Sequence, residues 1–221
     1  AISKHGYHYL QKQLPATLAA KIKLSYLGIS AQFDDVLSTK TSSSFTIVSC
    51  SSLIPLKRVA LLLESLTYSK LPIYWIHFGD GPLQSILLEK AKSLPTNVIA
   101  DFRGNLPNEK IMKFYRLNYV DLFISLSESE GLPVSMMEAI SFGVPILACA
   151  VNGVPEIVTD RTGVLLEKEI SAEAISAVLE NTLLHGTFDR EAIRSFCRDR
   201  FNAEVNFNSF VKQIKRVTND D

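Results

Sequence analysis

The feature that most constrains the fold is a sixfold alternation of short apolar runs with longer amphipathic stretches from residue 45 onward. The runs predict buried strands over residues 45–50, 73–78, 97–100, 121–125, 145–149 and 163–166. The stretches between and after them predict helices over residues 55–68, 82–93, 108–116, 134–142 and 171–184. Because parallel strands need long crossover connections, this pattern predicts a doubly wound α/β sheet of about six parallel strands.

The two ends of the chain fall outside this alternation. The elements expected there are a helix over 3–14, a strand over 21–27, a polar linker over 38–44, and helices over 190–198 and 203–217. We therefore expect three segments, residues 1–40, 41–186 and 187–221, of which the middle one is the α/β domain. Since the chain begins with Ala1 and not with Met, we expect it to be a piece of a longer protein.

Composition excludes several classes of function. Twenty-three basic residues balance twenty-three acidic ones, so the broad cationic face of a nucleic-acid binder is not expected. No apolar run approaches the roughly eighteen residues that cross a bilayer. The three cysteines and four histidines lack metal-ligand spacing, and sparse cysteines fit a reducing compartment. No metal site is predicted.

Chemistry is expected in the loops that follow the strands, because open parallel sheets bind ligands beyond the carboxyl ends of their strands. The loops over 51–57, 79–82, 103–107 and 127–134 contain glycines, basic side chains and carboxylates. The last of them leads into a predicted helix start, whose free N–H groups attract an anion. Its Gly131 allows the backbone to approach a ligand closely. Together these loops suit a phosphate-bearing ligand.

Two glutamates, Glu130 and Glu138, stand eight residues apart in and after this last loop. If helix covers most of the interval, their carboxylates lie on the order of 10 Å apart along its axis. That distance is too wide for the carboxylate pair of a retaining hydrolase and fits two contacts along one extended ligand. The spacing alone favours a plainer interpretation, with Glu130 a helix-start charge and Glu138 a solvated helix residue.

The wider pattern resembles a known family. Residues 130–148, EGLPVSMMEAISFGVPILA, resemble the signature of family 4 of the retaining glycosyltransferases: an acidic residue, Gly, a helix with a second Glu, then Gly-x-Pro and a strand. Further elements match in order, namely LIPLK ending at Lys57, GDGP at Pro82, FRG at Gly104 and GVPEIV at Val158. The resemblance spans about residues 45–184. It implies the C-terminal, nucleotide-sugar-binding half of a GT-B enzyme, which is a Rossmann-like domain.

This resemblance implies roles for individual residues. Glu130 matches the glutamate at the donor sugar that steadies charge during transfer, and Lys57 matches the lysine that neutralises the diphosphate. Glu138 matches the glutamate that accepts hydrogen bonds from the ribose hydroxyls. Loop 104–106 matches the segment that meets the base, and backbone N–H groups after Glu130 match the phosphate and sugar cradle. The remaining donor-binding positions are Ser52, Gly104, Asn105, Leu106, Gly131, Leu132 and Val134.

One departure from the family affects the diphosphate clamp. The family carries Gly-Arg five residues before its Lys, and here those positions are Ser51 and Ser52. Arg58 or Arg103 could substitute for the missing arginine, or Ser52 could donate a neutral hydrogen bond; the sequence leaves these open. Glu156 also resembles a family position near the donor, with a helix-start role as the alternative.

The resemblance implies a transferase that moves a sugar from a UDP- or GDP-sugar to an acceptor hydroxyl without a metal. It further implies bacterial polysaccharide or glycolipid synthesis in the cytoplasm, with association with the inner face of the membrane left open. The glycan or glycolipid acceptor would bind through a missing N-terminal domain, so the 221 residues are expected to bind nucleotide without turnover. Residues 1–40 resemble the trailing helix and strand of that domain with a linker, and residues 187–221 resemble the helices that pack back towards it. Two alternatives remain: a nucleotide-binding domain without catalytic function, and another GT-B activity such as a nucleotide-sugar epimerase.

Overall fold

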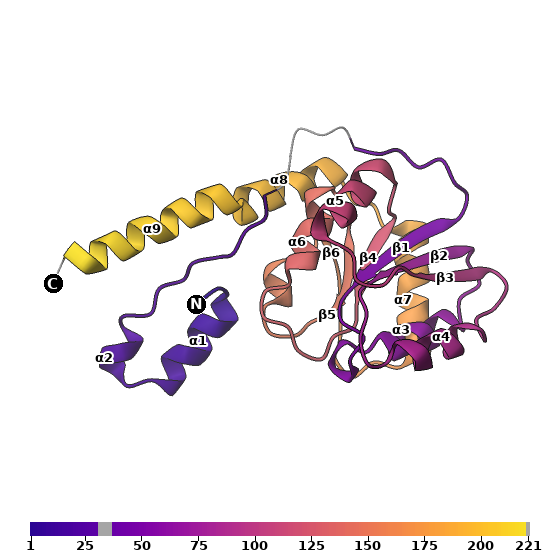
Figure 1. Ribbon diagram of the computed structural model, residues 1–221, viewed down its shortest axis with the longest axis horizontal. Coiled ribbons are helices and arrows are strands. Elements are labelled where there is room, and N and C mark those ends of the chain that lie inside the picture. The colour runs from indigo at the N-terminus through magenta and orange to yellow at the C-terminus, as the bar shows by residue number, and fades with distance from the viewer. Residues whose placement is uncertain (31–36, 220–221) are drawn as a thin grey trace.

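The computed structural model describes residues 1–30 and 37–219, and at its centre is one six-stranded parallel sheet (Figure 1). Its strands are β1 (Phe45–Cys50), β2 (Ile73–Phe78), β3 (Val98–Phe102), β4 (Leu122–Ser125), β5 (Ile146–Cys149) and β6 (Gly163–Leu166). They lie in the order β3-β2-β1-β4-β5-β6, and every neighbouring pair is parallel. This order winds from the centre to one edge and then to the other, which confirms the predicted doubly wound sheet.

Helices cover both faces of the sheet (Figure 1). They are α3 (Val59–Leu66), α4 (Gln84–Ala91), α5 (Asn108–Leu117), α6 (Val134–Ser141), α7 (Ala172–His185) and α8 (Arg190–Phe201). On one face α3 packs against α4 and α7, and on the other α6 packs against α8. Among the described residues, no helix is both long and apolar enough to cross a membrane.

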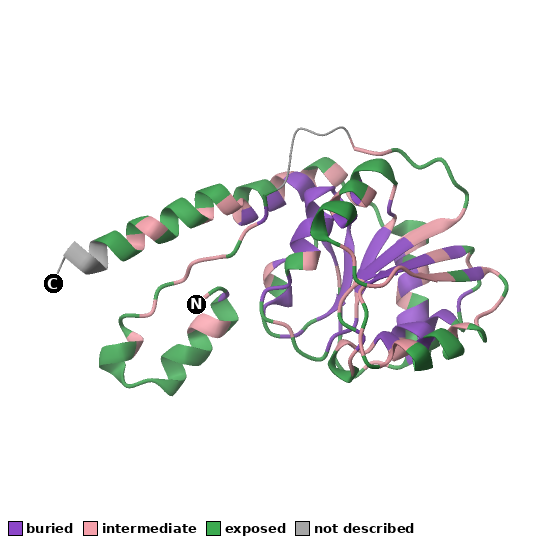
Figure 2. Cartoon of the chain, viewed as in Figure 1, coloured by how far each residue is buried: buried purple, intermediate pink, exposed green. Residues whose placement is uncertain are grey.

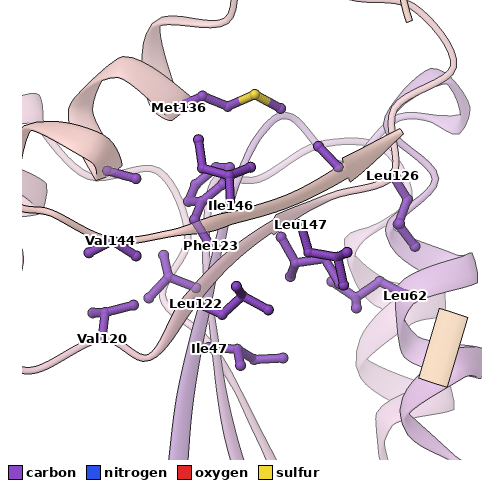
Figure 3. Packing of buried hydrophobic residues seen from close by; sticks show 14 of the residues in the cluster. Ile47, Leu62, Val120, Leu122, Phe123, Leu126, Met136, Val144, Ile146 and Leu147 are labelled. Atoms are coloured by element: carbon purple, nitrogen blue, oxygen red, sulfur yellow. The ribbon is translucent and has the colours of Figure 1, made fainter. Parts of the chain in front are cut away.

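The core lies on both sides of the central strands, which explains why these strands are apolar without alternation. Figure 3 shows Ile47, Phe123 and Leu147 from β1, β4 and β5 packed among side chains of the covering helices, and all three are buried. Leu62 of α3 and Met136 of α6 belong to the same cluster. This double cover leaves the ends of the strands as the accessible part of the sheet.

The predicted helix over 55–68 is wrong at its start. Residues Pro55–Lys57 form a 3₁₀ turn, and Arg58 then adopts a left-handed backbone with φ of 47° before α3 begins. The left-handed residue interrupts the helical hydrogen bonds, because it turns the chain out of the right-handed path. Lys57 therefore lies in a tight turn at the end of the β1 loop and not on a helix.

The chain ends form a terminal arm, defined here as residues 1–30 together with α9 (Ala203–Asn219) (Figure 1). Within it, α1 (Lys4–Gln13) and α2 (Ala16–Ala19) have no buried residue (Figure 2). The predicted strand over 21–27 is wrong. Within residues 1–30 and 37–219, the backbone of this segment pairs with no other strand. An isolated bridge between Ile29 and Asn202 is the sheet-like pairing there. Parts of the predicted terminal segments, residues 31–36 and 220–221, lie outside the described residues.

Candidate functional site

The sequence-predicted loops meet where β1 and β4 lie side by side. These two strands pair in the sheet, while the connections that follow them lead to opposite edges, which opens a crevice beyond their carboxyl ends. Lys57 from the β1 loop and Glu130 from the β4 loop form an ion pair there, with Nζ 2.6 Å from Oε1. The topology thus brings together the two residues for which the sequence predicts catalytic roles, although 73 positions separate them.

This ion pair is accessible to a ligand. The Lys57 side chain is 21% exposed and that of Glu130 is 14% exposed. A pair in partial contact with water contributes on the order of 1 kcal/mol or less, so a doubly charged anion can compete for the lysine. The arrangement can therefore hold an ammonium group in place before a phosphate arrives.

The start of α6 lies directly after Glu130 and has free capacity for an anion. Its N-cap residue is Pro133, which makes no side-chain capping hydrogen bond. The first backbone N–H groups of the helix therefore have no side-chain cap of the kind that usually satisfies them. A Cβ added at Gly131 would meet no atom within 4 Å, so the backbone there is open to a ligand. Leu132 is buried beneath the loop and Val134 is exposed at the helix start.

Glu138 lies in the second turn of α6, and its solvated-residue interpretation is wrong. Only 8% of the residue is exposed. Asn108, the first residue of α5, donates from Nδ2 to Oε1 of Glu138 at 2.5 Å. Burial raises the pKa of Glu138 because it disfavours the charged form, and the Asn108 hydrogen bond opposes that rise. Met136 and Met137, on the same helix, pack in the core.

The predicted base-binding loop over 104–106 is fastened to the neighbouring β2 loop. Gly104 has a φ of +66°, and its carbonyl accepts a hydrogen bond from the Gly79 N–H at 2.8 Å. Asn105 is exposed, while Leu106 packs against the core. The loop leads through Pro107 into α5, so the residues predicted to meet the base adjoin the helix that contacts Glu138.

Arg58 and Arg103, the two candidates to replace the missing clamp arginine, make no described contact with Lys57 or Glu130. Arg58 donates to the carbonyls of Leu126 and Lys168 and to the Cys149 thiol. Arg103 pairs with Asp101 at 2.9 Å and lies over the Phe114 ring. Both guanidinium groups therefore hold structural elements together in this structure.

A buried hydrogen-bond network links β1 and β2, and the sequence did not predict it. Trp75 donates from Nε1 to Ser49 Oγ, which lies 2.8 Å from His77 Nδ1, while His77 Nε2 lies 3.1 Å from the Ser51 carbonyl. Because a carbonyl can only accept, Nε2 carries the proton and Nδ1 accepts from the Ser49 hydroxyl. Burial lowers the pKa of His77 to about 4, which keeps the ring neutral. The parallel register that pairs Ser49 with His77 could not be read from the residues.

Glu156 has a helix-start role, at a helix far away in sequence. Its carboxylate accepts hydrogen bonds from the backbone N–H groups of Lys4 and His5 at the start of α1, at 2.9 and 3.1 Å. Tyr26 also donates to it, and burial together with this hydrogen bond raises the pKa of Tyr26 to about 12. Glu156 therefore fastens the terminal arm to the α/β domain.

The larger hollows among the described residues lie away from this crevice. One of about 760 Å³ lies between residues 37–46 and α5, and one of about 400 Å³ lies between the first residues of the chain and α9. A hollow of about 10 Å³ beside Lys57 lies at the crevice itself. Within residues 1–30 and 37–219, no cluster of three or more His, Cys, Asp or Glu could hold a metal ion.

Comparison with known proteins identifies sequence relatives. A family model described as glycosyl transferases group 1 matches residues 33–196. A sulfoquinovosyl transferase of Arabidopsis thaliana is 33% identical over 135 residues, which are 59% of this chain and 25% of that protein. The amylovoran biosynthesis glycosyltransferase of Erwinia amylovora is 24% identical over 209 residues, which are 90% of this chain and 51% of that protein. The chain therefore spans between a quarter and about half the length of these relatives.

Solved structures share the fold. An Anabaena protein in complex with UDP and glucose matches with a TM-score of 0.78 at 17% identity, over 98% of this chain and 62% of that one. A glycosyltransferase from Rickettsia africae matches with a TM-score of 0.82 at 18% identity, over the whole of this chain and 63% of that one. At such identities the likeness concerns the fold alone.

Proposed function

Because this chain belongs to the glycosyl transferases group 1 family, we propose that it forms the donor-binding half of a retaining family 4 glycosyltransferase. In this proposal the whole protein moves a sugar from a nucleoside diphosphate sugar to an acceptor hydroxyl. The observation that carries the proposal is the Lys57–Glu130 ion pair, which lies at the β1–β4 crevice beside a helix start without a side-chain cap. Anionic phosphate is the chemistry that such a helix start favours.

The catalytic roles follow from the charges at the crevice. The Lys57 ammonium would leave Glu130 for the diphosphate and stabilise the negative charge that grows on the departing nucleotide. Backbone N–H groups of Gly131, Leu132 and Val134 would add to the same stabilisation. Glu130, released from the lysine, would then face the positive charge that develops on the donor sugar.

The nucleoside would bind between α6 and the loop over 104–106. Loop 104–106 would meet the base, and Glu138 would accept hydrogen bonds from the ribose hydroxyls. A buried carboxylate suits this task, because hydrogen bonds to a charged acceptor are stronger away from water. Ser52 remains the proposed neutral donor at the position of the family's arginine.

The terminal arm supports a division of the whole protein into two domains. Apolar side chains of the arm are exposed, including Tyr9, Leu18, Phe207 and Phe210, and α9 lines the 400 Å³ hollow. Exposed apolar surface that lines a hollow in this way marks an interaction site. We propose that residues 1–40 are the trailing end of a further, acceptor-binding domain together with a linker, that residues 187–221 pack back towards that domain, and that residues 41–186 bind the donor. Without that domain the 221 residues would bind nucleotide and not transfer sugar.

Relatives suggest the donor and the pathway. The Anabaena protein of similar fold binds UDP, and the Erwinia relative is named for the biosynthesis of a polysaccharide. We propose a UDP- or GDP-sugar donor and an acceptor that is a bacterial glycan or glycolipid. The proposed location is the cytoplasm, where an acceptor carried on lipid would bring the protein to the inner face of the membrane.

A thermal-shift series with UDP, GDP and their sugars tests the donor site. A ligand at a hundredfold excess over its dissociation constant adds about 2.7 kcal/mol to the free energy of unfolding. We expect one nucleotide series to raise Tm, and Glu138→Ala to reduce that rise. Glu64→Ala, which changes an exposed glutamate of α3, is the matched control. No shift with either nucleotide, or an equal shift in Glu138→Ala, would overturn the proposal.

A second candidate, a nucleotide-binding domain without transfer activity, is favoured by one observation. Serines stand at positions 51 and 52, and both Arg58 and Arg103 are engaged in other contacts, so half of the expected cationic clamp has no described replacement. Joining the chain to its acceptor-binding domain and measuring sugar transfer separates the two candidates. Nucleotide binding without any transfer in the joined protein would favour the second.

A further inference from the structure

The carboxylate of Glu138 has one neighbour whose role neither the sequence nor the family resemblance assigns. Asn108 donates from Nδ2 to Oε1 of Glu138, and it is the one hydrogen-bond donor that the described residues give to this carboxylate. Asn108 is exposed and is the first residue of α5, separated from the loop over 104–106 by Pro107 alone. The contact therefore joins the loop proposed to meet the base to the residue proposed to bind the ribose.

We propose that Asn108 is a positioning residue for ribose recognition by Glu138. Its amide holds Oε1 in one place, which restricts the rotation of the carboxylate and leaves Oε2 to accept hydrogen bonds from the two ribose hydroxyls. This inference rests on the proposed function, since it takes the β1–β4 crevice as the nucleotide site. It goes further by adding a residue through which the base loop and the ribose contact are aligned.

The electrostatic surroundings of Glu138 give this amide an additional task. The titratable groups that face it are the Cys50 thiol from β1 and the Tyr115 hydroxyl from α5. Burial raises the pKa of Cys50 to about 11 and that of Tyr115 well above its usual value, so both are neutral near pH 7. Within residues 1–30 and 37–219, no cation acts on Glu138 to keep it ionised. The Asn108 hydrogen bond is what favours the charged form, which is the form that accepts from two hydroxyls.

Calorimetry of the whole 221-residue chain with UDP and 2′-deoxy-UDP tests the inference, with GDP and its deoxy form used instead if the chain prefers GDP. We expect Asn108→Ala to weaken UDP binding about tenfold, as for loss of a hydrogen bond to a charged group, and 2′-deoxy-UDP binding less. The preference for ribose over deoxyribose then falls, which a merely structural change in α5 would not produce. Asn118→Ala removes an amide at the other end of α5 and should leave both affinities unchanged. Asn108→Asp keeps the shape but faces Glu138 with a like charge, and should weaken binding more than Asn108→Ala.

A titration without nucleotide separates failure of this inference from failure of the proposed function. The pKa of Glu138, followed through its carboxyl carbon by NMR, should rise in Asn108→Ala and stay unchanged in Asn118→Ala. If UDP binds but Asn108→Ala alters neither the ribose preference nor the Glu138 pKa, the positioning role is wrong while the donor site stands. If the pKa rises but neither nucleotide binds, the contact is real and the nucleotide site is wrong, which overturns both proposals.

Discussion

The loop before α6 and the second turn of α6 each hold a glutamate of the proposed site, and the two regions differ in nearly every physical respect. Glu130 in the loop is partly exposed and paired with the Lys57 ammonium. Glu138 in the helix is buried and bonded to a neutral amide. One carboxylate has a countercharge and is partly exposed, while the other is buried and has no countercharge among the described residues.

Because of this difference, one short segment can bind two chemically different parts of a ligand. A partly exposed ion pair opens at modest cost, because water reaches the charges and replaces part of what each partner loses. A buried carboxylate with one fixed hydrogen bond resists rearrangement and discriminates between ligands that do and do not supply donors. The loop thus suits a charged group that arrives and leaves, and the helix suits neutral hydroxyls that must be recognised.

The largest effect is expected from Glu138→Ala, which removes the acceptor from the helix region. Loss of hydrogen bonds from two hydroxyls to a charged acceptor should weaken UDP or GDP binding about a hundredfold. Calorimetry with the nucleotide and with its 2′-deoxy form measures this loss of affinity. The variant should bind the two forms equally weakly, so that the preference for ribose over deoxyribose disappears. An unchanged preference would remove Glu138 from the site.

Lys57→Ala should have the next largest effect and should act on the phosphates alone. We expect binding of the nucleoside diphosphate to weaken about tenfold, and binding of the nucleoside itself to stay the same. Lys92→Ala, which changes an exposed lysine of another ion pair, is the control. Equal weakening of nucleoside and diphosphate would show that Lys57 acts on the fold of the loop instead.

Ser52→Arg should strengthen the loop region by restoring the family's second cation. The added guanidinium should tighten diphosphate binding about threefold, and the gain should shrink as salt is raised. Titrations at low and high ionic strength measure the change. Tighter binding at both salt concentrations alike would point to packing and not to charge.

The smallest effect concerns stability, where the two glutamates should differ in sign. The pKa of Glu138 is raised in the folded chain, so the folded state binds the proton more tightly than the unfolded one. Its contribution to the free energy of unfolding is present at low pH and is lost as pH rises through the raised pKa. Glu138→Gln should therefore raise Tm by a few degrees at pH 8 and change it little at pH 4.

Glu130→Gln is the partner measurement, because it breaks a partly exposed ion pair and should lower Tm slightly at pH 8. Scanning calorimetry of both variants at the two pH values compares the signs directly. A fall in Tm at pH 8 for Glu138→Gln would mean that the buried carboxylate stabilises the fold.

The sheet could be predicted from sequence because each strand carries its own signal. Runs such as residues 45–50 and 73–78 are apolar on both faces, and that pattern belongs to strands covered on both sides. The alternation over 21–27 looked equally clear, but a strand exists only where another backbone pairs with it. The break at Arg58 depends on tertiary hydrogen bonds to Leu126 and Lys168, so its own neighbours in sequence could not reveal it.

For the proposed site, the sequence could predict that the loops after β1 and β4 meet, and it could predict the surroundings of their side chains only in part. Topology alone places the loops after β1 and β4 together, so the meeting of Lys57 with Glu130 follows from the strand order. The burial of Glu138 does not follow, because it depends on how α5 lies against α6. For the same reason the contact of Asn108 with Glu138 could not be predicted, because in the sequence Asn108 is only one polar residue at the start of a helix.

The close packing of Gly153 between Gly131 and Ser3 links possible movements of these two segments. A Cβ placed there would lie 2.0 Å from the Gly131 carbonyl oxygen and 3.5 Å from the Ser3 Cβ, so a single backbone unit separates the loop before α6 from the start of α1. Glu156 fastens α1 to the same short stretch of chain. We therefore expect a displacement of α1 to shift the Gly131 backbone as well, because only the Gly153 backbone lies between them.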